Sequence, residues 1–167
     1  DPAMYHAELT VEEELQKAAD LGYEYLELSP RPDFHEWHRY PKVDDAMIAR
    51  VKKAMTSTGV KIWTLNPVYN WASPDELERQ HHVKNFRRTL EIANELEIPL
   101  IATEFSGDPN QPVRSENQFY RSMDELIPTF ESYGLECAVE AHPYDFVETN
   151  DRAVQIVRGV NKPWFNY

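Results

Sequence analysis

Amphipathic stretches with helical periodicity alternate with short apolar runs along the whole chain, and this alternation restricts the possible folds more than any other feature. The apolar runs cover about residues 23–28, 60–65, 100–103, 135–141 and 164–167, and the helical stretches cover about 10–21, 44–58, 73–96, 115–133 and 150–158. Each unit is roughly 30 to 40 residues long, as in repeated βα units. The pattern predicts an α/β protein built around a parallel sheet.

Local signals mark the ends of the helical stretches. Residues that favour helix amino termini precede four of them: Thr10, which forms a capping-box pattern with Glu13, Asp44 or Asp45, Ser73, which is followed by Pro74, and Asn150. Glycines follow four of them and are expected to end them: Gly22, Gly59, Gly134 and Gly159. Pro128 is expected to bend or shorten the fourth helix.

Polar residues gather where the apolar runs end. These residues are Glu27, Asn66, Glu104, and Glu140 with His142. In a βα barrel the carboxyl ends of all strands meet at one mouth, and the residues that bind and react with substrate lie there. The arrangement therefore favours a (β/α)8 TIM barrel. An open doubly wound sheet is the alternative, because such a sheet can be complete at this length.

The chain begins and ends part-way through a βα unit. A full eightfold barrel takes about 250 residues, whereas this chain has 167. We therefore expect a single domain, residues 1–167, that forms an N-terminal partial barrel of about five to six βα units, with the rest of the barrel beyond the C-terminus. Open sheet edges tend to pair with another chain, so we expect a homo-oligomer or association with a second subunit.

Charge and composition exclude several classes of protein. The formal net charge of −12 and the lack of a cluster of basic residues argue against nucleic acid as a partner. The apolar runs are far shorter than the ~20 residues that span a bilayer, and the first residues do not form a secretory signal. Cys137 is the single cysteine, which argues against a disulfide scaffold and favours the cytoplasm.

Glu140 is the strongest candidate for a metal ligand. It follows the apolar run that ends at Val139, where a carboxylate is costly to bury unless it meets a cation or strong donors. A divalent metal ion satisfies that need, and an ion pair with a Lys or Arg inside the barrel is the alternative. His142 lies two residues further on, hence on the same face of the strand. It is a candidate acid/base or substrate contact, or a hydrogen-bonded structural histidine.

Further candidates lie in the loops that follow the strands. Glu148 precedes a helix, where it can hydrogen-bond a substrate hydroxyl, remove a proton, or only complement the helix dipole. Glu104 and Asn66 are expected to contact substrate at the mouth, with a structural salt bridge as the alternative for Glu104. His35 and Trp71 belong to aromatic-rich loops. His35 can cover the mouth, and Trp71 can stack on the substrate or belong to the core.

Two adjacent histidines, His81 and His82, lie in the polar first turns of a helix and are expected to face solvent. The sequence contains no His-Glu-x-x-His, Cys-x-x-Cys, Gly-x-Ser-x-Gly or phosphate-loop pattern. Zincin, zinc-ribbon, serine-hydrolase and P-loop proteins therefore find no support in its motifs.

Three stretches resemble the xylose-isomerase-like sugar phosphate isomerase/epimerase family. They are LGYEYLELSP at residues 21–30, EFSG at 104–107 and EAHPYDF at 140–146. The likeness covers essentially the whole chain. Within the family it is similar to the myo-inositol-catabolism isomerase-like proteins and to the catalytic subunits of bacterial C-glycoside deglycosidases.

The resemblance implies a TIM barrel that holds one divalent ion. In the family this ion is commonly Mn²⁺, with Mg²⁺, Co²⁺ or Zn²⁺ as alternatives, and carboxylates and a histidine at the ends of strands five to eight bind it. The glutamate at the end of the fifth strand of the family's barrel corresponds to Glu140, which lies in the fourth apolar run of this chain. The other ligands are expected beyond Tyr167. Glu148 with the next two residues is similar to a segment in which a glutamate of ketose epimerases transfers a proton. The loop before it is two residues longer here, so His142 competes for that role.

The implied activity is isomerisation or epimerisation of a sugar or a sugar-like polyol or keto substrate. A side-chain base removes the proton next to a carbonyl that the metal polarises. The first alternative is a C-glycoside deglycosidase, a carbon–carbon lyase that acts on an oxidised sugar glycoside. A non-catalytic fragment or binding module is a further alternative, as is a related barrel nuclease acting on abasic DNA, which the net charge opposes.

Overall fold

The computed structural model describes residues 5, 8–29 and 44–167, so the predicted site residue His35 lies outside the described residues. The described residues form the helices α1 (Val11–Asp20), α2 (Asp45–Thr58), α3 (Glu76–Glu95), α4 (Pro112–Tyr133) and α5 (Asn150–Val160), and the strands β1 (Tyr25–Leu28), β2 (Lys61–Leu65), β3 (Leu100–Glu104), β4 (Glu136–Glu140) and β5 (Phe165–Asn166). Every predicted helix and strand is present. None of the described helices has the length and apolar character needed to cross a bilayer.

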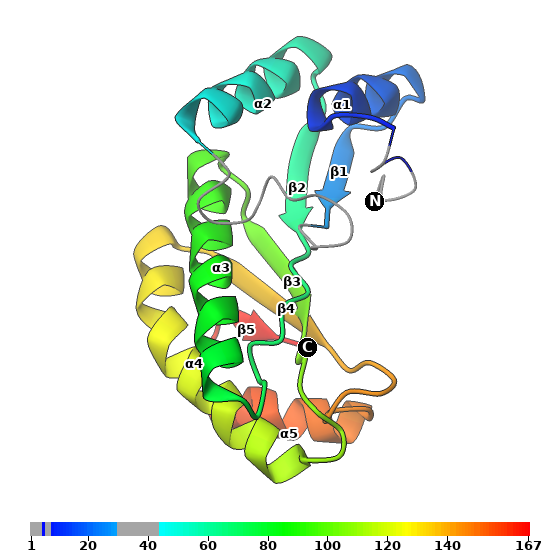
Figure 1. The fold of residues 1–167 in the computed structure, drawn as a ribbon. Coiled ribbons are helices and arrows are strands. Elements are labelled where there is room, and N and C mark those ends of the chain that lie inside the picture. Colours follow the sequence, from blue (N-terminus) through cyan, green and yellow to red (C-terminus); the bar gives the residue numbers. More distant parts are fainter. Residues whose placement is uncertain (1–4, 6–7, 30–43) are drawn as a thin grey trace.

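The strands pair in the order of the sequence, β1-β2-β3-β4-β5, and every pair is parallel. A doubly wound sheet reverses its strand order at a switch point, and this sheet does not. The helices follow one another around the outside of the strands, from α1 and α2 at the top of Figure 1, past α3 and α4, to α5 at the bottom. The prediction of a partial TIM barrel is confirmed.

The two faces of the sheet differ in burial. The residues of β3 and β4 that point toward the helices are buried, namely Ile101, Thr103, Cys137 and Val139. The alternate residues are half-buried or exposed, namely Leu100, Ala102, Glu104, Glu136, Ala138 and Glu140. Successive side chains of a strand point to opposite faces, so the buried set and the more exposed set lie on different faces of the sheet. The helices cover the face with the buried set, and we call the other the uncovered face.

Aromatic rings fill the space between the sheet and the helices α3 and α4. Phe86 stacks on Trp71 with ring centroids 4.6 Å apart, and Phe119 meets the same indole edge-on at 5.1 Å. Phe130 stacks on Trp164 at 4.8 Å. All of these rings except Trp164 are 0% exposed. Burial of one such side chain contributes about 1.5–3 kcal/mol, so this cluster is a main source of stability.

Several predicted helix ends are confirmed. Thr10 and Glu13 form the capping box of α1, and the side chain of Asp44 accepts a hydrogen bond from Met47 N at the start of α2. Gly59 adopts the left-handed conformation directly after α2, with φ 74°, and Gly134 does so after α4, with φ 65°. These positions favour glycine because it carries no Cβ.

Other predicted ends are wrong. Asp75 rather than Ser73 caps α3, because the hydroxyl of Ser73 bonds the side chain of Glu78 instead. Likewise Thr149, not Asn150, caps α5. Gly159 lies inside α5 and does not end it. A Cβ at this glycine would lie 2.3 Å from Tyr120 Oη, so the residue permits close packing of α5 on α4.

The helix α4 also differs from its prediction. It begins at Pro112, ahead of the expected start at Ser115. It then continues as one helix through Pro128 to Tyr133, so the proline does not shorten it. Proline is favoured in the first turn of a helix because the N–H that it lacks has no partner there. The earlier start places this terminus beside the loop that follows β3.

A buried arginine connects α3, α4 and the loop that precedes α3. The side chain of Arg79 is 1% exposed and donates to Glu76 at 2.9 Å, to Glu125 at 2.7 Å and to Ser122 Oγ at 3.0 Å. Ser122 Oγ in turn donates to Trp71 O at 2.5 Å. The hydrogen bond from Arg79 is the main reason why the pKa of Glu76 is lowered to about 2. This network fixes Trp71 through its main chain.

Candidate active site

Two carboxylates lie side by side at the carboxyl end of the sheet. Glu104 is the last residue of β3, Glu140 is the last residue of β4, and the two are partners in the parallel register. Both belong to the uncovered face. The side chain of Glu104 is 18% exposed, whereas Glu140 is exposed. Neighbouring carboxylates repel each other, so this position favours a cation or a proton donor between them.

His142 lies close to Glu104 at this end of the sheet. Its Nε2 is 3.9 Å from Glu104 Oε1, and its Nδ1 is 2.9 Å from Pro143 O. A carbonyl oxygen only accepts, so the proton of the neutral ring is assigned to Nδ1, and Nε2 keeps its lone pair. The ring is half exposed. His142 can therefore accept a proton at Nε2, and Glu104 stabilises the cation that forms.

A second polar pair lies at the carboxyl ends of β1 and β2. Asn66 follows β2 directly, and its Nδ2 donates to Glu27 Oε1 at 3.4 Å. Its backbone N–H donates to Leu28 O at 2.7 Å, which continues the pairing of the two strands. Both polar side chains are half-buried. An amide and a carboxylate in this position can donate to and accept from the hydroxyls of a polyol.

The loops after β3 and β4 are joined by Asp145, which is 6% exposed. Its carboxylate accepts from Ser106 N at 2.6 Å, Gly107 N at 2.8 Å and Phe146 N at 2.6 Å. Burial raises the pKa of Asp145, although these three donors act in the opposite direction. A Cβ on Gly107 would lie 2.4 Å from Phe146 Cδ1, so the loops approach too closely for a larger residue. The two loops therefore form one rigid part of the mouth.

Glu148 holds the loop after β4 in its shape. Its Oε1 accepts a hydrogen bond from Tyr144 N at 2.8 Å. Tyr144 has φ 68°, in the left-handed region that a bulky side chain rarely adopts. Its side chain is not packed against the protein, since the residue is 86% exposed. One oxygen of Glu148 is thus committed to the backbone of this loop.

Trp71 lies in the core and not on the surface of the mouth. It is 0% exposed, and its Nε1 donates to Glu104 O at 2.9 Å. Tyr69 of the same loop is 1% exposed. A ring without an exposed face cannot stack on a substrate, so the core role is the correct one of the two considered for Trp71. The indole affects the site only through the main chain of Glu104.

The two adjacent histidines differ from each other. His81 is exposed, as predicted. His82 is not solvent-facing as expected: its side chain is 17% exposed, and its ring stacks on Tyr69 with centroids 5.9 Å apart. Its Nε2 lies 3.8 Å from a carboxylate oxygen of Glu78. This histidine belongs to the packing of α3 against the loop that precedes it.

The geometry of the fold and of its mouth agrees with the result of sequence comparison. Residues 15–167 match the sequence profile described as the xylose isomerase-like TIM barrel. The chain belongs to this family. Comparison with curated proteins finds no significant match.

Several solved structures share the fold at low identity. D-psicose 3-epimerase in the presence of D-fructose superposes with a TM-score of 0.78 and 19% identity, covering 95% of this chain and 57% of that chain. 3-keto-D-glucoside 4-epimerase from E. coli superposes with a TM-score of 0.73 and 16% identity, covering 93% of this chain and 61% of that chain. The IolI protein with a bound zinc atom superposes with a TM-score of 0.72 and 20% identity, covering 98% of this chain and 58% of that chain. The chain thus spans 57% to 61% of the length of these proteins.

The described residues of this family member fit one side of a metal site. Glu140 presents an exposed carboxylate, and Glu104 lies beside it, so oxygen donors suited to Mn²⁺ or Mg²⁺ are available. Within residues 8–29 and 44–167, no three His, Cys, Asp or Glu side chains come close enough together to hold a metal ion. Cys137 is buried on the helix-facing side of β4 and offers no ligand to this side. Glu140 is thus suited to be one ligand among several.

Two residues of the mouth are not among those predicted from the sequence. Asp145 and Tyr144 both lie within the stretch EAHPYDF that carries the family resemblance, but its spacing does not single them out. The role of Asp145 depends on backbone N–H groups of a loop 38 and 39 residues away in sequence. The exposure of Tyr144 depends on how its own loop, after β4, turns. Periodicity within one segment reveals neither the partners of Asp145 nor the exposure of Tyr144.

Proposed function

We propose that this chain supplies part of the active site of a sugar isomerase or epimerase, which acts on a sugar or a sugar-like polyol or keto substrate. The observation that carries the proposal is the grouping at the carboxyl ends of β3 and β4. There Glu104 and Glu140 are register partners, and His142 Nε2 lies 3.9 Å from Glu104. A base beside paired carboxylates at the mouth of a barrel suits proton transfer to and from carbon.

His142 is the favoured base for removing a proton from the carbon next to the substrate carbonyl. Its hydrogen bond to Pro143 O leaves Nε2 free to accept that proton, and Glu104 stabilises the resulting imidazolium. In an isomerisation His142 returns this proton to the neighbouring carbon. In an epimerisation a second acid protonates the same carbon from its opposite face, and His142 releases its proton to solvent. Glu148 is the second candidate, with one of its oxygens already bonded to Tyr144 N.

Glu140 would hold a divalent metal ion together with ligands outside the described residues. A bound ion of this kind polarises the carbonyl oxygen of a substrate and so makes the adjacent C–H more acidic. Mn²⁺ is the ion we favour, whereas the IolI protein was solved with a zinc atom. Asn66 and Glu27 would bind hydroxyls on the side of the mouth formed by β1 and β2.

The structural neighbours support this class of reaction. Two of them are named as sugar epimerases, one acting on D-psicose and the other on a 3-keto-D-glucoside. Both reactions invert a carbon of a sugar. Epimerisation next to a carbonyl requires a base, and the described mouth supplies one in His142.

The test is exchange of substrate hydrogen with solvent. The protein with its complete barrel is incubated in D2O with D-fructose, D-tagatose and D-psicose, and NMR follows deuterium at the carbons next to the carbonyl. We expect exchange into at least one sugar, reduced about 100-fold or more in His142→Ala. Exchange that persists unchanged in His142→Ala would exclude this base, and no exchange in any of the sugars would count against the proposed reaction.

The metal assignment has a separate test. Glu140→Gln is expected to lose its metal ion, measured by elemental analysis of the purified protein, because an amide is a weaker ligand than a carboxylate. Glu136→Gln is the matched control, since Glu136 lies on the same face of β4 at its other end. Stoichiometric metal in Glu140→Gln would refute the assignment of this ligand.

A further inference from the structure

Tyr144 is the most exposed large hydrophobic residue of the described chain, at 86%. It sits at the tip of the loop after β4, two residues after His142. Two backbone hydrogen bonds close this loop, from His142 N to Val147 O at 3.2 Å and from Asp145 N to His142 O at 3.2 Å. The tip therefore extends from the same end of the sheet as the proposed base.

The backbone of Tyr144 is held in an unfavourable conformation. Its φ of 68° would suit glycine, whereas a large L-residue meets steric strain there. Two carboxylates maintain it: Glu148 accepts from Tyr144 N, and the adjacent Asp145 anchors the loop to Ser106 N and Gly107 N. Strain that the surroundings enforce in this way is characteristic of functional sites.

Within the part of the chain that the structure describes, the ring is too exposed to gain packing that offsets this strain. No ring contact of Tyr144 is found among the aromatic pairs of the described residues, whereas Phe146, two residues later, packs against Phe105 and Phe119. A large exposed ring beside a polar site typically serves binding, because it combines an apolar face with a hydroxyl.

We propose that Tyr144 is a substrate-contacting residue whose ring packs against the apolar C–H face of a sugar, and that Glu148 and Asp145 are the residues that position it. The inference rests on the proposed function. It names the ligand class as an uncharged sugar ring, since the carboxylate of Glu148, which accepts from Tyr144 N, disfavours a phosphorylated one. It also assigns the aromatic contact to Tyr144 and not to the buried Trp71.

Kinetics of the complete protein separate binding from chemistry. With the sugar that shows exchange in D2O, Tyr144→Ala is expected to raise KM roughly tenfold, which corresponds to about 1.4 kcal/mol, while kcat changes less than about threefold. Tyr144→Phe keeps the ring and is expected to restore most of the affinity. Equal KM values for wild type and Tyr144→Ala would overturn the inference.

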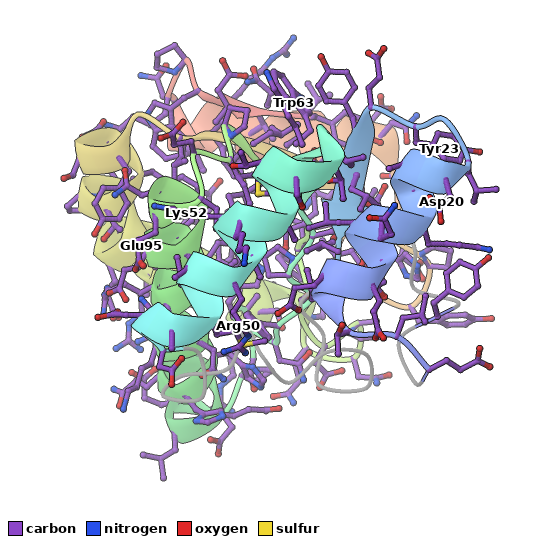
Figure 2. The ribbon with its side chains drawn as sticks, turned by 90° about the horizontal axis from the view of Figure 1, so that it is seen from above. Asp20, Tyr23, Arg50, Lys52, Trp63 and Glu95 are labelled. Carbon is purple, nitrogen blue, oxygen red and sulfur yellow. The ribbon has the colours of Figure 1, made fainter. Side chains whose placement is uncertain are left out.

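Tyr23→Ala is the matched control, because it removes another exposed tyrosine far from the mouth. Tyr23 is 64% exposed and precedes β1, beside Asp20 at the end of α1 in Figure 2. It lies at the amino end of the sheet, opposite to the loops that follow the strands. We expect no change of KM in this variant. A rise of KM equal to that of Tyr144→Ala would contradict a specific contact.

Thermal unfolding provides a measurement that needs no substrate. Tyr144→Gly relieves the left-handed strain, so we expect its Tm to rise by roughly 1–3 °C while its KM rises as in Tyr144→Ala. A residue with a merely structural role would lower the Tm when removed. If no tested sugar reacts, the proposed function fails and the inference fails with it. If a sugar reacts but Tyr144→Gly lowers the Tm, the side chain stabilises the fold, and the inference alone is overturned.

Discussion

Replacement of Trp71 by alanine is expected to destabilise the protein strongly. The ring is 0% exposed, stacks on Phe86 at 4.6 Å and meets Phe119 edge-on at 5.1 Å. Truncation of a buried aromatic to alanine costs about 3–5 kcal/mol, from lost burial and the cavity left behind. The change also removes the donor to Glu104 O. We expect a loss of about 4 kcal/mol, and about 1–2 kcal/mol for Trp71→Phe, which keeps a ring without the donor.

Urea unfolding followed by circular dichroism measures this loss. With a slope of roughly 2 kcal/mol per molar urea, 4 kcal/mol lowers the midpoint by about 2 M. Leu77→Ala is the matched control, because Leu77 lies on α3, the helix that also carries Phe86, but is 78% exposed. Its midpoint is expected to stay within about 0.3 M of wild type. If Trp71→Ala has the same midpoint as Leu77→Ala, the indole does not belong to the core, and its role as a substrate contact returns.

Two further predictions concern ionisable groups. Because Arg79 lowers the pKa of Glu76 from 4.5 to about 2, the pair stabilises the folded state above pH 4.5, and this contribution is lost as the pH falls from 4.5 to about 2. The Glu76 side chain is 34% exposed, and solvent screening reduces the lost stability to about 1 kcal/mol. Urea midpoints measured against pH should show this loss in wild type and not in Glu76→Gln. Identical pH profiles of the two proteins would contradict the prediction. Burial raises the pKa of the Cys137 thiol, so iodoacetamide at pH 8 is expected to label it only as fast as the protein unfolds, measured by mass spectrometry. Faster labelling would mean that β4 opens locally.

Local patterns were sufficient to predict the elements of this fold. Thr10 and Asp44 cap helices because their side chains reach N–H groups three residues later, an interaction within one segment. The order of strands also followed from sequence, since repeated βα units pair their strands in sequence order in a barrel. The position of Glu104 and Glu140 at strand ends was predictable for the same reason.

The errors share a dependence on contacts between segments. Ser73 and Asp75 can both cap α3, and the bond from Ser73 to Glu78 decides between them. Gly159 has the appearance of a helix stop, but the nearby ring of Tyr120 explains it. Trp71 lies in a loop, where aromatic residues often serve binding, yet two helices enclose it. In each case the role of the residue is decided by a contact with another part of the chain or by a competing hydrogen bond.

The site residues illustrate the same division. Asn66 and His142 were predicted from their place after a strand, but their partners were not, because pairing with Glu27 or Glu104 requires the register between strands. Asp145 was missed altogether. Its three donors come from two loops, and a carboxylate in a short polar loop has no sequence pattern that distinguishes such a role.

Two alanines, Ala102 and Ala138, are register partners one step below Glu104 and Glu140 on the uncovered face. Their small side chains leave room above this part of the uncovered face, while the next residues along the strands, Thr103 and Val139, are buried on the side of the helices. Reshaping the uncovered face therefore leaves the helix layer intact. A barrel built in this way can acquire a new substrate by substitution of every second residue of its strands, those on the uncovered face, with little loss of stability.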